Sequence, residues 1–172
     1  MSAIRDVAVV VGNPKPASRT LAAATYVAEQ LAGRPPDTVI DLATLGPALL
    51  DWHNASIAAL VEDVRAAQLI VVASPTYKGS YTGLLKLFLD RFAADSLTGV
   101  LAVPLMLGAA PHHALAPEVF LRPVLAELGA TVPGKALYVL EDKYDTPAQY
   151  EPWLEAARPF VTAAAREAVT SQ

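Results

Sequence analysis

The sequence predicts an α/β protein built as a three-layer α/β/α sandwich, with one open five-stranded parallel sheet between two layers of helices. Short runs of β-branched and aliphatic residues alternate with stretches of helical periodicity along the chain. Several of the short runs are apolar throughout, which is typical of strands covered on both faces. The 172 residues suit a single domain with a sizeable core, and we expect one domain over residues 1–172.

The first half of the chain shows this alternation clearly. Residues 7–11 read VAVVV, a strand that is apolar at every position. Residues 18–32 carry apolar side chains at helical spacing and end before Gly33, a residue typical of helix termini. Residues 38–42, TVIDL, predict the second strand. Residues 56–67 predict an amphipathic helix with apolar side chains on one face.

The second half repeats the pattern. Residues 69–73, LIVVA, predict the third strand, and residues 80–94 predict a helix with leucine and phenylalanine at helical spacing. Residues 100–107 predict the fourth strand, and residues 116–128 the next helix. Residues 136–140, ALYVL, predict the fifth strand.

The closing helix is expected over residues 150–168, with Pro159 kinking or interrupting it. Five alternating strands fit the doubly wound order 2-1-3-4-5, whereas the Rossmann order needs six. Ligands in such sheets bind beyond the carboxyl ends of the strands, near the switch point between the first and third. Function is therefore expected in the loops after the first, third and fourth strands.

Composition excludes several kinds of chemistry. The chain has a formal net charge of −4 and no cysteine. A net negative surface disfavours nucleic acid or an anionic membrane as the main partner. The lack of cysteine excludes disulfides, thiolate nucleophiles, cysteine-based zinc sites and iron–sulfur clusters. Any redox chemistry must therefore come from a bound cofactor.

Neither a targeting segment nor a membrane span is expected. The apolar stretch 7–11 is shorter than the apolar region of a signal peptide. The longest apolar run, 100–111, is interrupted by Pro104 and Gly108 and is shorter than the ~20 residues of a spanning helix. The expected compartment is the cytoplasm.

The loop after the first strand, GNPKPASRT at 12–20, ends where a helix is expected to begin. The free N–H groups and the dipole of a helix N-terminus attract anions. The hydroxyls of Ser18 and Thr20 and the cations Lys15 and Arg19 suit a phosphate monoester. The loop matches neither the P-loop nor the dinucleotide-binding pattern. In the alternative interpretation, Ser18 only caps the helix and the rest of the loop is solvated.

The loop after the third strand, 73–83, has Pro75 at the strand end, followed closely by Tyr77 and Gly79. An aromatic side chain beside backbone donors can hold a planar heterocycle. The alternative is an ordinary turn in which Ser80 caps the next helix and Tyr81 packs locally.

The loop after the fourth strand, GAAPHHA at 108–114, is made of small residues that allow a ligand to approach the backbone. His112 and His113 are adjacent and would diverge, so a metal site is not expected. We place His112 at the rim of the ligand and His113 in solvent or at a helix cap. Paired carboxylates and a nucleophile elbow are missing from the strand ends, so no catalytic side chain is predicted and a bound cofactor is favoured.

The segment SPTYKGSYTGLLK at 74–86 resembles the third-strand signature of NAD(P)H-dependent FMN reductases, which have the flavodoxin-like fold. The loop 12–20 resembles the phosphate loop of that family, and LRPVLAELGA at 121–130 is also typical of it. The resemblance extends from the first strand to the last. It is closest to the reductase components of two-component flavin monooxygenases, including the alkanesulfonate type.

The resemblance implies FMN, with its phosphate on the first loop and its isoalloxazine ring against the other two. It also implies NADPH or NADH as donor of a hydride that passes from nicotinamide C4 to flavin N5. The reduced flavin would serve a partner monooxygenase, or a small acceptor such as a quinone. By position, the residues implied to bind cofactor are Asn13, Lys15, Ser18, Arg19, Thr20, Pro75, Thr76, Tyr77, Lys78, Gly79, Gly108, Ala109, Ala110 and His112.

The chain departs from the family pattern at three places. Asn13 stands where the family often has serine, and it can still donate and accept hydrogen bonds. Ala109 and Ala110 replace glycines beside the expected flavin edge. Sulfonate-type members can carry an extra tyrosine that makes a π-bulge at a subunit interface. The corresponding stretch, PEVFL at 117–121, has none, so the bulge is not expected here.

Two other function classes stay open. A flavodoxin-like electron carrier would bind flavin without oxidising NAD(P)H, but the basic Lys15 and Arg19 and the modest net charge speak against it. The alanines at 109–110 leave open a binding module that has lost its flavin.

A homodimer or homotetramer is also expected, because the chain has more large apolar groups than one small core obviously needs. These groups are Tyr81, Leu84, Phe88 and Trp153, and the alternative is that they belong to the core.

Overall fold

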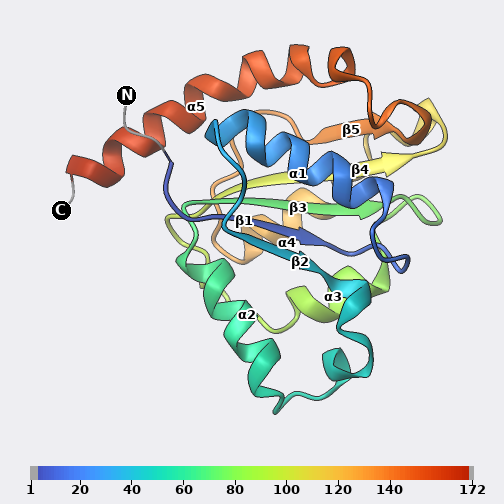
Figure 1. The fold of residues 1–172 in the computed structure, drawn as a ribbon, viewed down its shortest axis with the longest axis vertical. Coiled ribbons are helices and arrows are strands. Elements are labelled where there is room, and N and C mark those ends of the chain that lie inside the picture. The colour runs from blue at the N-terminus through green and yellow to red at the C-terminus, as the bar shows by residue number, and fades with distance from the viewer. Residues whose placement is uncertain (1–3, 171–172) are drawn as a thin grey trace.

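Five parallel strands form one sheet in the order β2-β1-β3-β4-β5 in the computed structural model, which describes residues 4–170 (Figure 1). The strands are β1 (Val7–Val11), β2 (Thr38–Asp41), β3 (Leu69–Pro75), β4 (Leu101–Gly108) and β5 (Leu137–Leu140). Both the strand count and the order are as predicted, and the order is that of the flavodoxin-like fold.

The helices cover both faces of the sheet, as the all-apolar strands require. They are α1 (Arg19–Ala32), α2 (Ala55–Ala66), α3 (Gly83–Leu89), α4 (Arg122–Glu127) and α5 (Glu151–Thr170). Helices α1 and α5 lie together on one face, and α2 and α3 lie on the other (Figure 1). Helix α4 packs with the second group, because its Leu125 belongs to the same apolar cluster as Phe88 of α3.

Two separate cores result from the alternation of side chains along each strand. Val7, Val9 and Val11 of β1 pack on the α1–α5 face, whereas Ala8 and Val10 pack on the opposite face. A strand that contributes to two cores must be apolar at every position, which explains the sequence pattern. Full burial of each valine contributes roughly 1.5–3 kcal/mol to folding.

Helix α3 is shorter than the predicted helix 80–94. Lys78 (φ 53°) and Gly79 (φ 81°) both have left-handed backbone conformations, and Tyr77 and Ser80 exchange backbone hydrogen bonds on either side of them. Two left-handed central residues make a tight turn of type I′. Ser80 is therefore part of the turn and does not cap the helix. Thr82 is the N-cap and accepts a hydrogen bond from the Leu85 amide.

A π-helical turn spans Pro117–Leu121 immediately before α4, so the expectation that this stretch lacks a π-bulge was wrong. The Arg122 amide donates to the carbonyl of Pro117, five residues back. Pro123 has no N–H, so the Val119 carbonyl loses its α-helical donor and the wider turn becomes competitive. The turn forms here without the tyrosine on which the expectation depended.

Helix α5 continues through Pro159, where a kink or interruption was predicted. Apart from α4, which begins only after the π-helical turn, the boundaries of the other elements differ from the predictions by one or two residues. Ser18, predicted as the first helical residue, is the N-cap of α1, and α2 begins one residue earlier than predicted, behind Asn54. Among the described helices, none has the length and hydropathy that crossing a membrane requires.

Asp37, just before β2, gives the fold an acid-sensitive contact. Its carboxylate accepts hydrogen bonds from the Arg34 guanidinium and from the Val7 amide. The pKa of Asp37 is lowered to about 2, chiefly by the Arg34 bond and then by the Val7 bond.

Because the pKa of Asp37 lies below its unfolded value of 3.8, the stability that the carboxylate adds is present above about pH 4 and is lost as pH falls to about 2. We expect Asp37→Asn to be less stable than the wild type near pH 6, with the difference shrinking between pH 4 and 2. Urea unfolding across that range measures it. A pH-independent difference would contradict this origin of the stability.

Candidate functional site

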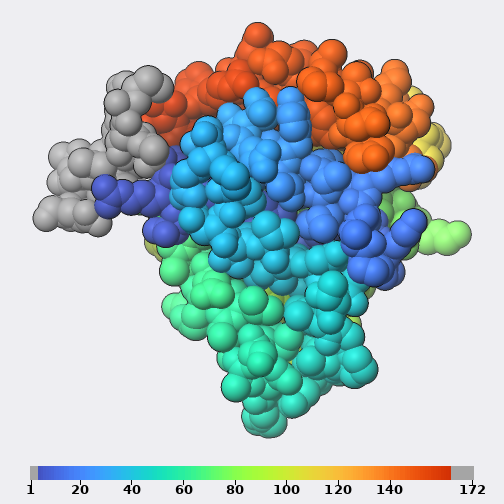
Figure 2. Space-filling view, viewed as in Figure 1, coloured from blue at the N-terminus to red at the C-terminus, as the bar shows by residue number. Residues whose placement is uncertain are grey.

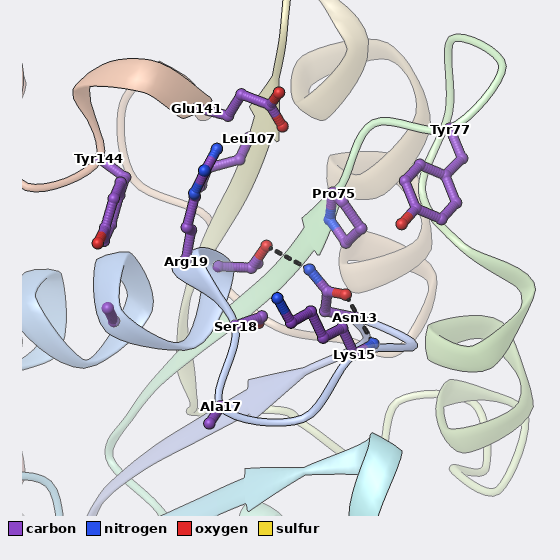
Figure 3. A pocket seen from close by; sticks show the side chains of 12 residues that line it. Asn13, Lys15, Ala17, Ser18, Arg19, Pro75, Tyr77, Leu107, Glu141 and Tyr144 are labelled. Atoms are coloured by element: carbon purple, nitrogen blue, oxygen red, sulfur yellow. Dashed lines mark hydrogen bonds between the residues drawn. The ribbon is translucent and has the colours of Figure 1, made fainter.

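One cavity of about 340 Å³ lies at the carboxyl ends of β1, β3 and β4, the position that the fold class predicts for a ligand. Its volume falls within the ~300–1,000 Å³ typical of small-molecule sites. Figure 2 shows the loop after β1, in blue, and the projecting tip of the loop after β3, in light green, at this edge. The lining residues are Asn13, Lys15, Ala17, Ser18, Arg19, Thr20, Ala22, Pro75, Tyr77, Leu107, Glu141 and Tyr144 (Figure 3).

Hydrogen bonds from Asn13 hold the first loop in shape. The Asn13 side-chain amide donates to the Thr20 hydroxyl at 3.0 Å, and its oxygen accepts from the Lys15 amide at 2.9 Å (Figure 3). Asn13 and Thr20 are both buried. The side chain of Asn13 is therefore used to fix the shape of the loop. The Thr20 hydroxyl only accepts from Asn13, so its own proton stays free to be donated to a ligand.

The loop ends at the N-terminus of α1. Ser18 caps the helix by accepting from the Leu21 amide at 3.2 Å, and the first turn contains no acidic residue. In the part of the chain that the structure describes, the amides of Ser18, Arg19 and Thr20 have no hydrogen-bond partner. Ala17 has a left-handed backbone, and its amide donates to Asp41. These free amides at the positive end of a helix dipole can bind an anion.

Ser18→Ala should lower the stability of the protein whether Ser18 only caps α1 or also contacts a ligand, because the cap is lost in both cases. The expected cost is about 1 kcal/mol, the usual value for an N-cap. Asn54→Ala is the matched control, because Asn54 caps α2 by accepting from the Ser56 and Ile57 amides and does not line the cavity. Urea unfolding should give similar losses for both variants, whereas only Ser18→Ala should weaken the binding of inorganic phosphate. Equal phosphate binding by the two variants would leave Ser18 as a cap alone.

Two cations border the anion site. Lys15 and Arg19 are exposed at the mouth of the cavity. The Arg19 guanidinium lies 5.9 Å from the ring centroid of Tyr144, a cation–π contact. Glu141 lines the same wall and is exposed.

Glu141 and Tyr144 were not among the predicted site residues, because function was expected in the loops after the first, third and fourth strands and β5 lies farther from the switch point. The sequence feature that could have indicated Tyr144 is an aromatic residue shortly after the end of the fifth strand.

The loop after β3 supplies the opposite wall. Pro75 ends the strand, and Tyr77 projects beside the cavity with 54% of its surface exposed (Figure 3). The Thr76 amide donates to Leu107 of β4 at 2.6 Å. The Thr76 hydroxyl oxygen is buried and has no hydrogen-bond partner among the described residues. The wall that this loop presents to a ligand therefore consists of Pro75 and Tyr77.

Thr82 ties this loop to the first one. Its hydroxyl donates to the Gly12 carbonyl and accepts from the Leu85 amide at 3.2 Å. Its own amide donates to the Ser74 hydroxyl at 3.0 Å. All three of these hydrogen bonds are buried, so the α3 N-cap fixes the loops after β1 and β3 relative to each other.

The loop after β4 is held by β5. The Tyr138 hydroxyl donates to the Ala110 carbonyl at 2.7 Å, and burial raises the pKa of Tyr138, so the phenol stays a donor. A Cβ on Gly108 would lie 2.1 Å from that hydroxyl, so a larger residue at this position would displace the end of the Tyr138 side chain. The rings of His112 and His113 lie 4.1 Å apart.

The structure brings together only part of the predicted set. Asn13, Lys15, Ser18, Arg19, Thr20, Pro75 and Tyr77 line the cavity. Thr76, Lys78, Gly79, Gly108, Ala109, Ala110 and His112 lie outside its lining. Their assignment to the cofactor stays a prediction. Over the described residues, no group of three or more potential metal ligands occurs.

Known proteins similar to this chain point to one family. The model of the family described as NADPH-dependent FMN reductase matches residues 5–145. The chain is 31% identical over 150 residues to an FMN reductase (NADPH) of Pseudomonas aeruginosa, covering 84% of this chain and 81% of that protein. It is 30% identical over 125 residues to an FMN reductase (NADPH) of Escherichia coli K12, covering 70% of this chain and 65% of the relative.

Among solved structures, the apo form of an NADH:FMN oxidoreductase (EMOB) superposes with a TM-score of 0.81 at 31% identity. The superposition covers 91% of this chain and 88% of that one.

Proposed function

Since this chain belongs to the family of NADPH-dependent FMN reductases, we propose that it reduces FMN with a nicotinamide dinucleotide and releases the reduced flavin to an acceptor. The observation that carries the proposal is the division of the cavity. Free helix amides and two cations lie at one end, and Pro75 and Tyr77 lie at the other. That division matches a ligand with a phosphate at one end and a planar ring at the other.

The phosphate end fits FMN. The amides and hydroxyls of Ser18 and Thr20 supply donors, and Lys15 and Arg19 supply charge. A phosphate monoester carries close to two negative charges at neutral pH, so four donor groups and two cations are a suitable set. Asp41 holds the loop through the Ala17 amide, at 2.9 Å, which keeps the donors aimed at one point.

The ring end fits as well. Pro75 and Tyr77 provide flat surface at this end of the cavity. When bound, FMN accepts the hydride of the nicotinamide, so the chain needs no acid, base or nucleophile of its own. The chain's part is to hold the ring, fix the approach of the dinucleotide and exclude water from one face.

The walls of the site favour exchange of the flavin over permanent enclosure. Tyr77 is 54% exposed, and both Lys15 and Arg19 reach solvent. We therefore propose that reduced FMN leaves the protein and serves a flavin-dependent monooxygenase, with a quinone as the alternative acceptor. The cytoplasm stays the predicted compartment.

The experiment is a titration followed by a turnover assay. Purified protein is titrated with FMN while flavin fluorescence is recorded, and NADH or NADPH oxidation is then followed by absorbance. Quenching and saturable oxidation are expected. FMN binding without oxidation would favour an electron carrier, and neither binding nor oxidation would favour a module that has lost flavin.

The acceptor is tested separately. If reduced flavin is released, NAD(P)H oxidation should depend on FMN at concentrations above that of the protein. A quinone that sustains turnover at a single equivalent of FMN would instead indicate reduction inside the site.

We also propose that the protein is a homo-oligomer, although the large apolar side chains on which the sequence-based expectation depended belong to the cores or pack against them. Phe88 is fully buried in the core, and Tyr81 and Leu84 pack against that core. Trp153 packs against the other cluster.

Three other residues near the π-helical turn, Leu115, Val119 and Phe120, are 70%, 54% and 45% exposed. Clustered exposed apolar residues are typical of interfaces. Val119→Glu should lower the mass seen by sedimentation, whereas Leu50→Glu, on another surface, should not. A wild type that sediments only as a monomer would contradict the proposal.

A further inference from the structure

A second, smaller cavity adjoins the one already described. Its volume is about 120 Å³, and its lining residues are Ala22, Tyr26, Tyr144, Asp145, Pro147 and Tyr150. Ala22 and Tyr144 also line the larger cavity, so the two share a wall. A volume of 120 Å³ is below the ~300 Å³ of a site for a whole small molecule. The cavity therefore suits one part of a ligand whose remainder lies next door.

The walls of this cavity are aromatic and fixed. The rings of Tyr26 and Tyr150 lie 4.9 Å apart at an interplanar angle of 57°, a favourable tilted arrangement. Tyr150 is only 1% exposed, and its hydroxyl donates to the Tyr144 carbonyl. The backbone of Tyr144 is thus anchored, and a planar group would meet preformed aromatic surface.

Arg19 stands at the boundary between the two cavities. It lines the larger one, and its guanidinium lies 5.9 Å from the ring centroid of Tyr144. In Figure 3, Arg19 lies between Tyr144 on one side and Pro75 and Tyr77 on the other. The edge of the sheet therefore presents an aromatic wall, a cationic centre and a second aromatic wall in sequence.

We propose that the smaller cavity is a subsite for the adenosine half of a dinucleotide, either FAD or NAD(P)H. Such a ligand has an aromatic ring at each end and a diphosphate between them, which is the order of groups at this edge. Arg19 would hold the diphosphate, because a guanidinium pairs well with phosphate oxygens. The adenine would lie against Tyr26 and Tyr144, and the Asp145 carboxylate would accept from a ribose hydroxyl or from the adenine amino group.

The inference rests on the proposed function, because it places the other half of the dinucleotide at the flavin site: the flavin half of FAD within that site, or the nicotinamide half of NAD(P)H against the flavin bound there. It adds a ligand class to that function. A reductase with this subsite would distinguish FAD from FMN, or a dinucleotide donor from a nicotinamide mononucleotide, through residues that touch no flavin.

The test uses Tyr26→Leu, which removes one aromatic wall, with Tyr26→Phe as the matched control that keeps the ring. Kd values for FAD and FMN are measured by fluorescence quenching, and KM values for NADH and NADPH with FMN as flavin. Loss of a stacking contact should weaken binding of the adenosine half about tenfold in Tyr26→Leu. Tyr26→Phe should resemble the wild type. Asp145→Ala is a second variant, at an exposed side chain outside both cores, and the affinity for the same ligand should fall about tenfold or more.

The flavin Kd values and the dinucleotide KM values together show whether the subsite binds the adenosine half of FAD or that of NAD(P)H. A higher FAD Kd with unchanged FMN Kd and dinucleotide KM assigns the subsite to FAD. A higher KM for NADH and NADPH with an unchanged FAD-to-FMN ratio assigns it to the hydride donor. If FMN is bound and reduced normally and both variants match the wild type in every arm, the subsite is wrong and the proposed function stands. If the wild type neither binds nor reduces FMN, the proposed function itself is wrong.

Discussion

Arg19→Gln is expected to weaken FMN binding by about 10- to 100-fold, the range of a lost charge-assisted hydrogen bond. Arg19 lies at the first turn of α1, lines the cavity and is the cation nearest its Tyr144 wall. Riboflavin has the same ring system without the phosphate, so its Kd should not change. The comparison of the two Kd values by fluorescence quenching therefore isolates the phosphate.

Arg65→Gln is the matched control, because it makes the same change of net charge on α2, where Arg65 pairs with Glu62 on the surface. Its effect on FMN should be less than about twofold, since distant surface charges are screened by salt. An equal loss of FMN and riboflavin affinity in Arg19→Gln would show that Arg19 shapes the loop and does not bind phosphate.

Gly12→Ala is expected to destabilise the protein by about 3 kcal/mol and to abolish tight flavin binding. A Cβ at Gly12 would lie 2.3 Å from the Leu85 Cβ and 2.9 Å from its Cα. Helix α3 would have to move away from β1, because the clash involves backbone and not the end of a flexible side chain. Overpacking of this kind costs roughly 1–3 kcal/mol. The shift also separates the Gly12 carbonyl from the Thr82 hydroxyl.

Gly83→Ala is the control for this substitution, because Gly83 belongs to α3, the helix against which Gly12 packs. A Cβ at Gly83 would meet nothing within 4 Å, and its φ is not in the left-handed region. We expect unchanged stability or a gain of up to about 1 kcal/mol, because alanine has less conformational freedom when unfolded. Thermal unfolding of both variants checks the pair. A fully stable Gly12→Ala would mean that α3 repacks without cost.

The sequence predicted the strands and the long helices because their patterns report burial directly. An all-apolar run such as VAVVV at 7–11 can hardly be anything but a strand with a core on each face. The order of strands followed from the number of strands alone, because five fit one of the two common doubly wound orders and six the other. These features depend on many residues at once, so single exceptions do not alter them.

The loops after β3 and β5 could not be predicted, because they depend on single backbone conformations. Lys78 adopts a left-handed φ, which residue preferences do not favour for lysine, and the resulting turn displaced the cap from Ser80 to Thr82. The π-helical turn follows from the proline at 123, which the predicted helix 116–128 passed over. Tyr144 reaches the site because α5 packs beside α1, a relation between elements that no local pattern contains.

The anchoring role of Thr82 has a consequence for the energetics of ligand entry. Because its backbone and hydroxyl link Ser74 and Gly12 through buried bonds, the two main walls behave as one preorganised unit before any flavin arrives. Little conformational entropy is then lost when the ligand binds. The hydrogen-bonded amides of Gly12, Thr76 and Thr82 should therefore exchange with solvent slowly in the ligand-free protein, and adding FMN should slow them only modestly.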